Sequence, residues 1–440
     1  MKLMVPFRLY DAGVAQRRTT YKIQLSLRVA TCLAVVFAGC GLVSAQAQNA
    51  RYTIQDLGIV GVNPGQPFVI SNDGFIAGSS DVSGVEHAIV YRPNGMADIG
   101  QPGLGGNSIA FGVNDLGIAV GEAEDAKGPS TTEDFCGFQS MGFATSLQAC
   151  IPFIRQNGKL TPLKTLGGVN GVANQINLWG AVAGYAENQI VDLDCPAPQQ
   201  YQFKPVVWSQ AKVQVLPTHS DPEGVAFSIN DWGQAVGASG TCAAFNPNFL
   251  FNLNPVHALF WQNGVAIDMG NLGGAFNNFG HDINNWGQVV GGSDLAGDLT
   301  SHAFAWTRGS KMQDLGAVSD SLDDDAYSVG LGINDEGQIV GLSASADFSV
   351  VRGFISQNGK LVDLNSLVTG TTSMDLITAC SINASGAIIG LAFDTDTGDM
   401  HSYMAIPRLV GPEGSRILRQ SQLPDWIREQ LRSGRTTESD

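Results

Sequence analysis

The chain has 440 residues, of which 54 are glycine, 44% are apolar and 15% are charged. This composition is typical of a folded protein with many turns and excludes a disordered polymer. The formal net charge is −16, and residues 1–47 hold six of the 24 basic residues but only one of the 40 acidic residues. The rest of the chain is therefore strongly acidic and would repel a phosphate backbone, so we expect no nucleic-acid partner.

Residues 1–47 have the features of an export signal. Four basic residues, the last of them Arg28, precede an uncharged run at residues 29–42, which is too short to span a bilayer. Cleavage is expected after Ala47. Phe37-Ala38-Gly39-Cys40 resembles a lipobox and leaves a lipid anchor at Cys40 open, whereas Arg17-Arg18 fits a twin-arginine signal poorly. We expect a periplasmic, secreted or cell-surface protein with no integral membrane span.

A turn motif recurs seven times after this signal. It consists of an asparagine, two variable residues, a glycine and a β-rich run that ends in glycine, as in INDWGQAVG from Ile229 and INNWGQVVG from Ile283. Repeats of this length are typical of solenoids and propellers. We place the asparagines, 42 to 63 residues apart, at Asn72, Asn114, Asn177, Asn230, Asn284, Asn334 and Asn383.

A second motif lies between these turns. His302-Ala303-Phe304 begins one copy, and a strand with Asp314-Leu315-Gly316 ends it. Where Asn-Gly separates the two strands, as at Asn263-Gly264, it is a strong signal for a tight hairpin. Each unit therefore has four antiparallel strands, which we name a to d: strand a ends at the motif asparagine, and strand c holds the histidine.

The two ends of the repeat region complement each other. Residues 52–58 form a strand of type d with no preceding partner, and the last unit ends with strand c at residues 401–405. We therefore predict an all-β fold, a seven-bladed β-propeller of four-stranded antiparallel blades closed by the N-terminal strand. A β-solenoid or a sandwich is the alternative. The expected organisation is an export signal at 1–47, the propeller at 48–410, and a polar C-terminal tail at 411–440, partly helical or disordered.

These units resemble the HAF family of extracellular repeat proteins, named for its His-Ala-Phe segment. The resemblance rests on His302-Ala303-Phe304, on the INxxGQxVG turns and on Leu272-Gly273-Gly274, and it covers residues 52–407. It implies an exported repeat protein and brings no activity, cofactor or catalytic residue. Three units depart from the pattern, with Ile151, Lys204 and Arg352 at the position of the histidine. An essential ligand would not be expected to change in this way.

We assign no catalytic residue, because the sequence holds no HExxH, GxSxG or CxxC motif. The repeated histidines are interpreted as structural, and His219 and His281 have no evident partner nearby in the sequence. Trp179, Trp232 and Trp286 share one turn position. They either form a sugar-stacking surface or, as we favour, pack between adjacent blades or cover the hairpin.

Two acidic loops are candidates for binding cations. Asp394, Asp396 and Asp399 alternate with small residues and could bind Ca²⁺, the only cofactor that we consider. Solvated polar turns are the alternative for these residues and for the second acidic loop, at Asp320 and Asp323–Asp325.

Five cysteines remain after Ala47. Cys136 and Cys150 flank one long loop, and Cys195 and Cys242 lie in loops of neighbouring blades on the same face, so we predict disulfides 136–150 and 195–242. Cys380 is expected to be a buried free thiol inside a strand a. Five free thiols are the alternative.

The b-to-c loops at 122–149, 185–203 and 239–256 carry most of the length variation and share one face. We expect a binding scaffold that takes an extracellular polysaccharide or protein on this long-loop face. The alternatives are an extracellular hydrolase acting on a sugar or an ester, and a structural cell-surface or adhesin component.

Overall fold

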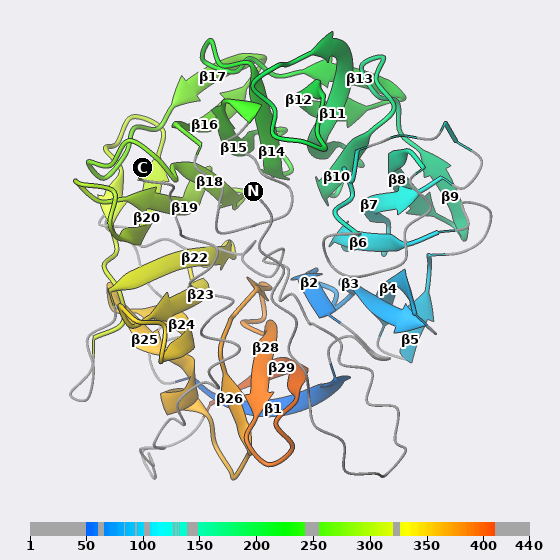
Figure 1. The fold of residues 1–440 in the computed structure, drawn as a ribbon. Helices are drawn as coiled ribbons and strands as arrows, with labels where there is room; N and C mark the ends of the chain where they lie inside the picture. Colours follow the sequence, from blue (N-terminus) through cyan, green and yellow to red (C-terminus); the bar gives the residue numbers. More distant parts are fainter. Residues whose placement is uncertain are drawn as a thin grey trace, which may run out of the picture.

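The computed structural model describes residues 50–409, except 60–65, 83, 93–94, 101–105, 126–127, 130, 132, 139–147, 243–254 and 320–325. In this part the chain is nearly all β, and seven antiparallel sheets radiate from a common axis (Figure 1). The predicted seven-bladed β-propeller is confirmed. Within the same residues, no helix has the length and apolar character needed to cross a membrane.

Six blades are formed by consecutive strands a, b, c and d, with strand a nearest the axis (Figure 1). Blades one to three comprise β2 (Gln66–Ile70), β3 (Ile76–Val82), β4 (Val85–Arg92) and β5 (Gly95–Asp98); β6 (Ser108–Val113), β7 (Ala119–Glu124), β8 (Cys150–Gln156) and β9 (Lys159–Pro162); β10 (Gly171–Ile176), β11 (Val182–Val191), β12 (Tyr201–Ser209) and β13 (Lys212–Val215). Blades four to six comprise β14 (Glu223–Ile229), β15 (Ala235–Gly240), β16 (His257–Gln262) and β17 (Val265–Asp268); β18 (Phe279–Ile283), β19 (Gln288–Asp294), β20 (Ser301–Thr307) and β21 (Gln313–Asp314); β22 (Tyr327–Ile333), β23 (Ile339–Ala344), β24 (Val351–Gln357) and β25 (Lys360–Asp363), followed by a short 3₁₀ helix, Leu364–Leu367.

The seventh blade closes the ring. It contains β26 (Met374–Leu376), β27 (Ser381–Ile382), β28 (Ile388–Asp394) and β29 (Met400–Leu409), and the N-terminal strand β1 (Ala50–Ile59) is its outermost strand. β1 pairs with β29 antiparallel, with Tyr52 opposite Pro407 and Asp56 opposite Tyr403. The predicted closure is therefore confirmed, and the Tyr52 side chain is fully buried in the same hydrophobic cluster as Tyr403.

Strand a of the seventh blade differs from our expectation. We predicted that Cys380 lies inside a continuous strand, but it lies between β26 and β27, which pair separately with β28. The Ala379 N–H donates to the Gly341 carbonyl of the sixth blade at 3.2 Å, so the ladder with β28 is interrupted at this point. Cys380 is nevertheless buried and forms no disulfide within the described residues, as predicted.

Local sequence explains the recurring geometry of the blades. Strand a carries a β-bulge near its end, as between Ala226 and Ser228, and strand b approaches it so closely that a Cβ at Gly237 would overlap the Val225 carbonyl oxygen. The last glycine of the turn motif is therefore required by this contact. In the c-to-d turn of blade four, Asn263 and Gly264 have φ values of 52° and 77°, as a two-residue type I′ hairpin requires.

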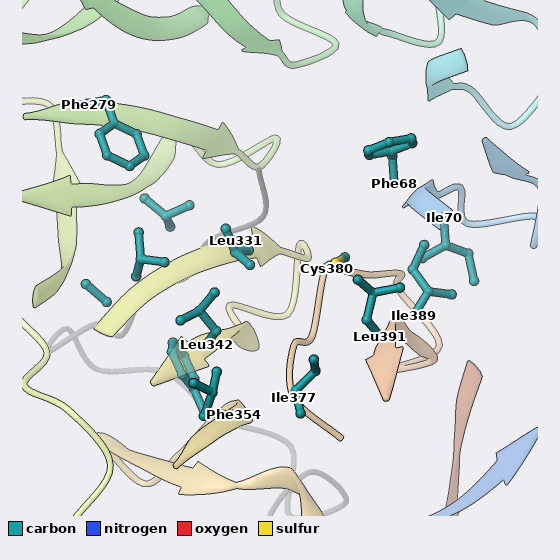
Figure 2. Close-up of a cluster of buried hydrophobic side chains, with 14 of the residues drawn as sticks. Phe68, Ile70, Phe279, Leu331, Leu342, Phe354, Ile377, Cys380, Ile389 and Leu391 are labelled. Carbon is teal, nitrogen blue, oxygen red and sulfur yellow. The ribbon is translucent and has the colours of Figure 1, made fainter. Parts of the chain in front are cut away.

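The largest hydrophobic cluster draws on every blade. Figure 2 shows Phe68, Leu331, Cys380 and Phe279, which come from different blades, gathered in one region. Aromatic contacts also join neighbouring blades, with 5.2 Å between the ring centroids of Phe68 and Phe111. The blades share this cluster, and smaller clusters lie between neighbouring blades, so each blade depends on its neighbours for burial.

Candidate functional site

The short a-to-b turns form a ring of hydrogen bonds around one end of the axis. In blade three, Asn177 Nδ2 donates to the Asn230 carbonyl of the next blade at 2.9 Å, while Asn177 Oδ1 accepts the N–H of Trp179 and of Ala181 in its own turn. The same link between blades runs from Asn114 to Asn177, Asn230 to Asn284, Asn284 to Asn334, Asn334 to Asn383 and Asn383 to Ser71, at 2.9–3.3 Å. The motif asparagines therefore join neighbouring blades.

The first repeat needs a correction. We placed its motif residue at Asn72, but Ser71 occupies this position, because the Gly74 N–H donates to the Ser71 carbonyl as the Gly117 N–H donates to that of Asn114. Asn72 is one residue further along the turn, and its N–H donates to Asp115 Oδ1 of blade two at 2.7 Å. A serine and an asparagine in succession both suit a turn, so the sequence pattern left the register of this repeat ambiguous.

A small axial cavity lies inside this ring. It measures about 150 Å³ and is lined by residues from all seven blades, among them Ser228, Asp231 and Asp282. Small-molecule sites occupy about 300–1,000 Å³, so this cavity is small for a substrate. Burial raises the pKa of the Asp282 carboxyl to about 6, although hydrogen bonds from Ser228 Oγ and two backbone N–H groups partly offset this effect by lowering the pKa.

An arc of exposed tryptophans surrounds this end of the axis. Trp179, Trp232 and Trp286 belong to blades three, four and five and are 77%, 76% and 75% exposed. The rings are therefore not buried between blades, although Trp286 Nε1 donates to the Asp335 carbonyl of blade six at 2.9 Å. The motif asparagine holds the backbone of each turn from inside, which leaves the following residues at the tip in solvent. We call these three residues the tryptophan arc.

The repeated histidines hold strands c and d together. Nδ1 of His87 lies 2.8 Å from Asp98, and Nδ1 of His302 lies 2.8 Å from Asp314. Burial raises the pKa of the Asp314 carboxyl, but hydrogen bonds from His302 and from the Gly316 N–H outweigh this effect and leave the pKa below its ordinary value. This geometry supports the structural interpretation of the histidine motif.

The contact between strands c and d also occurs in the blade that closes the propeller, and its position shows what replaces the histidine in other blades. In blade seven, His401 Nδ1 lies 3.0 Å from Asp56 Oδ1 of the N-terminal strand. In blade six, Arg352 replaces the histidine and lies 3.6 Å from Asp363. Blade two has Ile151 in place of the histidine and Pro162 in place of the aspartate. Blade two thus replaces both residues of the pair, whereas blade six keeps the aspartate and replaces only the histidine.

Both predicted disulfides are present on the long-loop face. Cys136 and Cys150 have Cα atoms 5.5 Å apart, and Cys195 and Cys242, with Cα atoms 4.8 Å apart, join the loops of blades three and four. The loop at 185–203 is described throughout, whereas those at 122–149 and 239–256 lie partly outside the described residues.

Two buried glutamates belong to these loops, Glu133 to the loop at 122–149 and Glu187 to the loop at 185–203. Asn170 joins them, since its N–H donates to Glu187 and its side-chain amide donates to Glu133. Burial, and then the neighbouring Glu133 carboxyl, raises the pKa of Glu187 to about 8. Gln199 also donates to Glu187, and the Gln200 N–H donates to Glu133. Burial and these hydrogen bonds favour a structural role for the pair.

The calcium site predicted at Asp394, Asp396 and Asp399 stays a prediction. Asp394 is buried, and its Oδ1 accepts the Asp396 N–H at 2.9 Å, so it caps its own turn. Its Oδ2 lies 3.9 Å from His401 Nε2, whereas Asp396 and Asp399 are exposed. The loop with Asp320 and Asp323–Asp325, the tail at 411–440, and the export signal with Cys40 and Ala47 lie outside the described residues.

The sequence did not predict one cluster on the long-loop face. His219 in the loop before β14, His257 at the start of β16 and Asp268 at the end of β17 place one ligand atom each within 4.8 Å of one another. They come from three separate segments, and His257 looks in sequence like any other repeated histidine. Only the folded blade brings them together.

Comparisons with known proteins find no matching family model and no matching curated protein. Among solved structures, the chain is similar to a gluconolactonase from Xanthomonas campestris (11% identity, 83% of this chain and 93% of the other, TM-score 0.37). It is also similar to a Trypanosoma rangeli sialidase (10% identity, 81% of this chain and 58% of the other, TM-score 0.34). A third similar structure is a sugar dehydrogenase from Streptomyces coelicolor (9% identity, 82% of this chain and 99% of the other, TM-score 0.32). Matches at this level do not support a shared function.

Proposed function

We propose that the protein is an exported member of the HAF family and acts as a binding scaffold outside the cytoplasm. The export features of residues 1–47 and the histidine and turn motifs support this proposal. The two disulfides agree with it, because disulfides persist mainly outside the cytoplasm. Propellers carry function in the loops at their two faces, so the nature of the binding site has to come from those loops.

Polysaccharide is the ligand best supported, and the tryptophan arc is the observation that carries it. Three indole rings at equivalent positions of consecutive blades are about three-quarters exposed. Large apolar patches on a protein surface mark binding sites, and the proposal takes the three rings to act together as one. The C–H face of a sugar ring packs well on an indole. Asp231 and Asn285, each one residue before a tryptophan of the arc, bind to each other and to the turns of neighbouring blades, so the turns that carry the indoles are held in fixed positions. A polymer with repeating units can contact several blades at once and gain avidity.

A protein partner on the long-loop face is the second candidate. The loop at 185–203 exposes Ile190, Val191 and Leu193, the last of them 93% exposed. The Cys195–Cys242 disulfide fixes the end of this loop to blade four. An apolar surface on an anchored loop suits a protein contact better than a sugar contact.

Immobilised polysaccharides separate these proposals. Replacement of all three tryptophans of the arc with alanine should lower polysaccharide affinity at least about tenfold, or about 1.4 kcal/mol. The matched control is the triple variant Ile190→Ser, Val191→Ser, Leu193→Ser, which removes as many exposed apolar side chains from the opposite face and should bind normally. Loss of binding in the control alone would move the site to the long-loop face.

A broad hydrolase panel run beside the binding assay tests the enzymatic alternative. Glu133 and Glu187, a close carboxyl pair, are buried and bonded within the protein, which disfavours acid–base chemistry on an outside substrate. Turnover of a sugar or an ester by the wild type would favour the hydrolase. A deletion strain that loses surface attachment while the purified protein binds no polysaccharide would favour the structural or adhesin role.

A further inference from the structure

Blade four departs from the histidine–aspartate contact of the other blades. Elsewhere Nδ1 of the repeated histidine lies against the aspartate of strand d, as in the 2.8 Å pair of His302 and Asp314. In blade four, Nδ1 of His257 lies 2.8 Å from Asp221, in the loop between β13 and β14. Nε2 of His257 lies 4.0 Å from the strand-d residue, Asp268. Nε2 of His257, the ring nitrogen that does not contact Asp221, is therefore available to bind a ligand.

A second imidazole lies beside this nitrogen. His219 belongs to the same loop as Asp221, and its ring centroid is 4.6 Å from that of His257. Thr218 Oγ1 donates to the Asp221 carbonyl at 2.6 Å across this tight turn. His219 is exposed, and the side chains of His257 and Asp268 are 24% and 31% exposed, so an ion can reach all three from solvent.

We propose that His219, His257 and Asp268 bind a divalent transition-metal ion on the long-loop face. Two imidazoles and one carboxylate are a donor set typical of Zn²⁺ sites that keep a position open for water or another ligand. Only blade four supplies the second histidine, so the propeller carries one such site in the part of the chain that the structure describes.

Asp221 is the positioning residue of this site. An ionised carboxylate can only accept, so Nδ1 of His257 donates to Asp221 and Nε2 keeps its lone pair for the metal. Ser239 Oγ donates to the same carboxylate oxygen and fixes its orientation. This arrangement of carboxylate, histidine and metal ligand is the usual support for a metal-bound imidazole.

Metal binding must draw the three ligands together. Zn²⁺ bonds to nitrogen and oxygen are about 2.0–2.2 Å long, so tetrahedral ligand atoms lie about 3.3–3.5 Å apart. Here the ligand atoms lie within 4.8 Å of one another. Rotation of the exposed His219 side chain can close much of this difference without moving the blade. Because the ion binds the folded chain, it should also raise the melting temperature.

The test uses the tag-free full mature chain, stripped with a chelator and then titrated with ZnCl₂ by calorimetry and with CoCl₂ by visible absorption. We expect one ion per chain and the strong visible bands of four-coordinate Co²⁺. His219→Ala and Asp268→Asn should each abolish stoichiometric binding. Asp221→Asn should weaken it about 10–100-fold. The matched control, His302→Ala, removes a repeated histidine from a blade without the cluster and should bind as the wild type does.

The outcomes are distinguishable. A wild type that binds neither ion, or that binds equally well after His219→Ala, overturns the proposal. Binding that survives His219→Ala and is lost in Asp394→Asn would place the ion in the acidic turn of blade seven and would also overturn it. His219 is exposed and outside the core, so its variant should fold normally, which the circular dichroism spectrum can verify. None of these results depends on polysaccharide binding.

Discussion

Replacement of Asn177 with alanine should test whether the ring of turns stabilises the propeller. The side chain is buried and makes three hydrogen bonds of 2.9–3.1 Å, one to the Asn230 carbonyl of blade four and two with N–H groups of its own turn. A buried hydrogen bond contributes about 1 kcal/mol net, so the free energy of unfolding should fall by about 3 kcal/mol.

Two further variants sharpen this prediction. Asn177→Asp keeps an acceptor for the turn but replaces the donor with a carboxylate oxygen that faces the Asn230 carbonyl, so it should destabilise at least as much as alanine. Ser71→Ala is the matched control at the equivalent position of blade one, where the side chain makes one hydrogen bond to its own turn, from the Phe75 N–H. Its loss should be only about 1 kcal/mol.

The assay is urea-induced unfolding of the oxidised protein, followed by tryptophan fluorescence and far-UV circular dichroism. Coincident transitions in the two signals would justify a two-state free energy. A loss below about 1 kcal/mol for Asn177→Ala, or an Asn177→Asp variant as stable as the wild type, would refute the stabilising role of the ring.

Three further predictions concern disulfides, pH and calcium. Peptide mapping without reduction should find the 136–150 and 195–242 links, with Cys380 alkylated only after unfolding, and joint replacement of Cys136 and Cys150 by serine should cost about 3 kcal/mol. A Cys380 bridge would contradict the pairing. The pKa of Glu187 is raised from 4.5 to about 8, so the folded state holds a proton that the unfolded chain has lost in this range. Stability should therefore fall as the pH rises from about 4.5 to 8. Burial also raises the pKa of Glu86, Glu223 and Asp282 in this range, so Glu187→Gln should make the dependence shallower in urea melts without abolishing it; an equally steep profile in the variant would contradict the assignment. If Asp394, Asp396 and Asp399 bind Ca²⁺, the melting temperature should be higher in millimolar calcium than in EGTA, and equal values would exclude the site.

The tryptophans and histidines show where prediction from the sequence ended. The repeat placed Trp179, Trp232 and Trp286 at one turn position, but did not show whether the rings pack inward or face solvent. Their exposure follows from the asparagine ring, whose contacts run between blades. His219 and His257 are 38 positions apart, and the turn before β14 brings them together. Blade four alone replaces the usual aspartate contact of its histidine with Asp221.

The sequence by itself determined the features that depend on local chemistry or on repetition. The sequence predicted seven blades from the glycine and asparagine turns and the short strands between them. It predicted the closure of the ring because the first segment is a strand d without a blade and the last unit lacks a strand d. The positions of the loops predicted the disulfide pairs. Tertiary structure alone decided that Ser71 replaces the first motif asparagine, that Cys380 lies in a break of strand a, and that His219, His257 and Asp268 converge. These features depend on contacts between segments distant in the chain, and a repeat pattern contains no information about which side chains such contacts bring together.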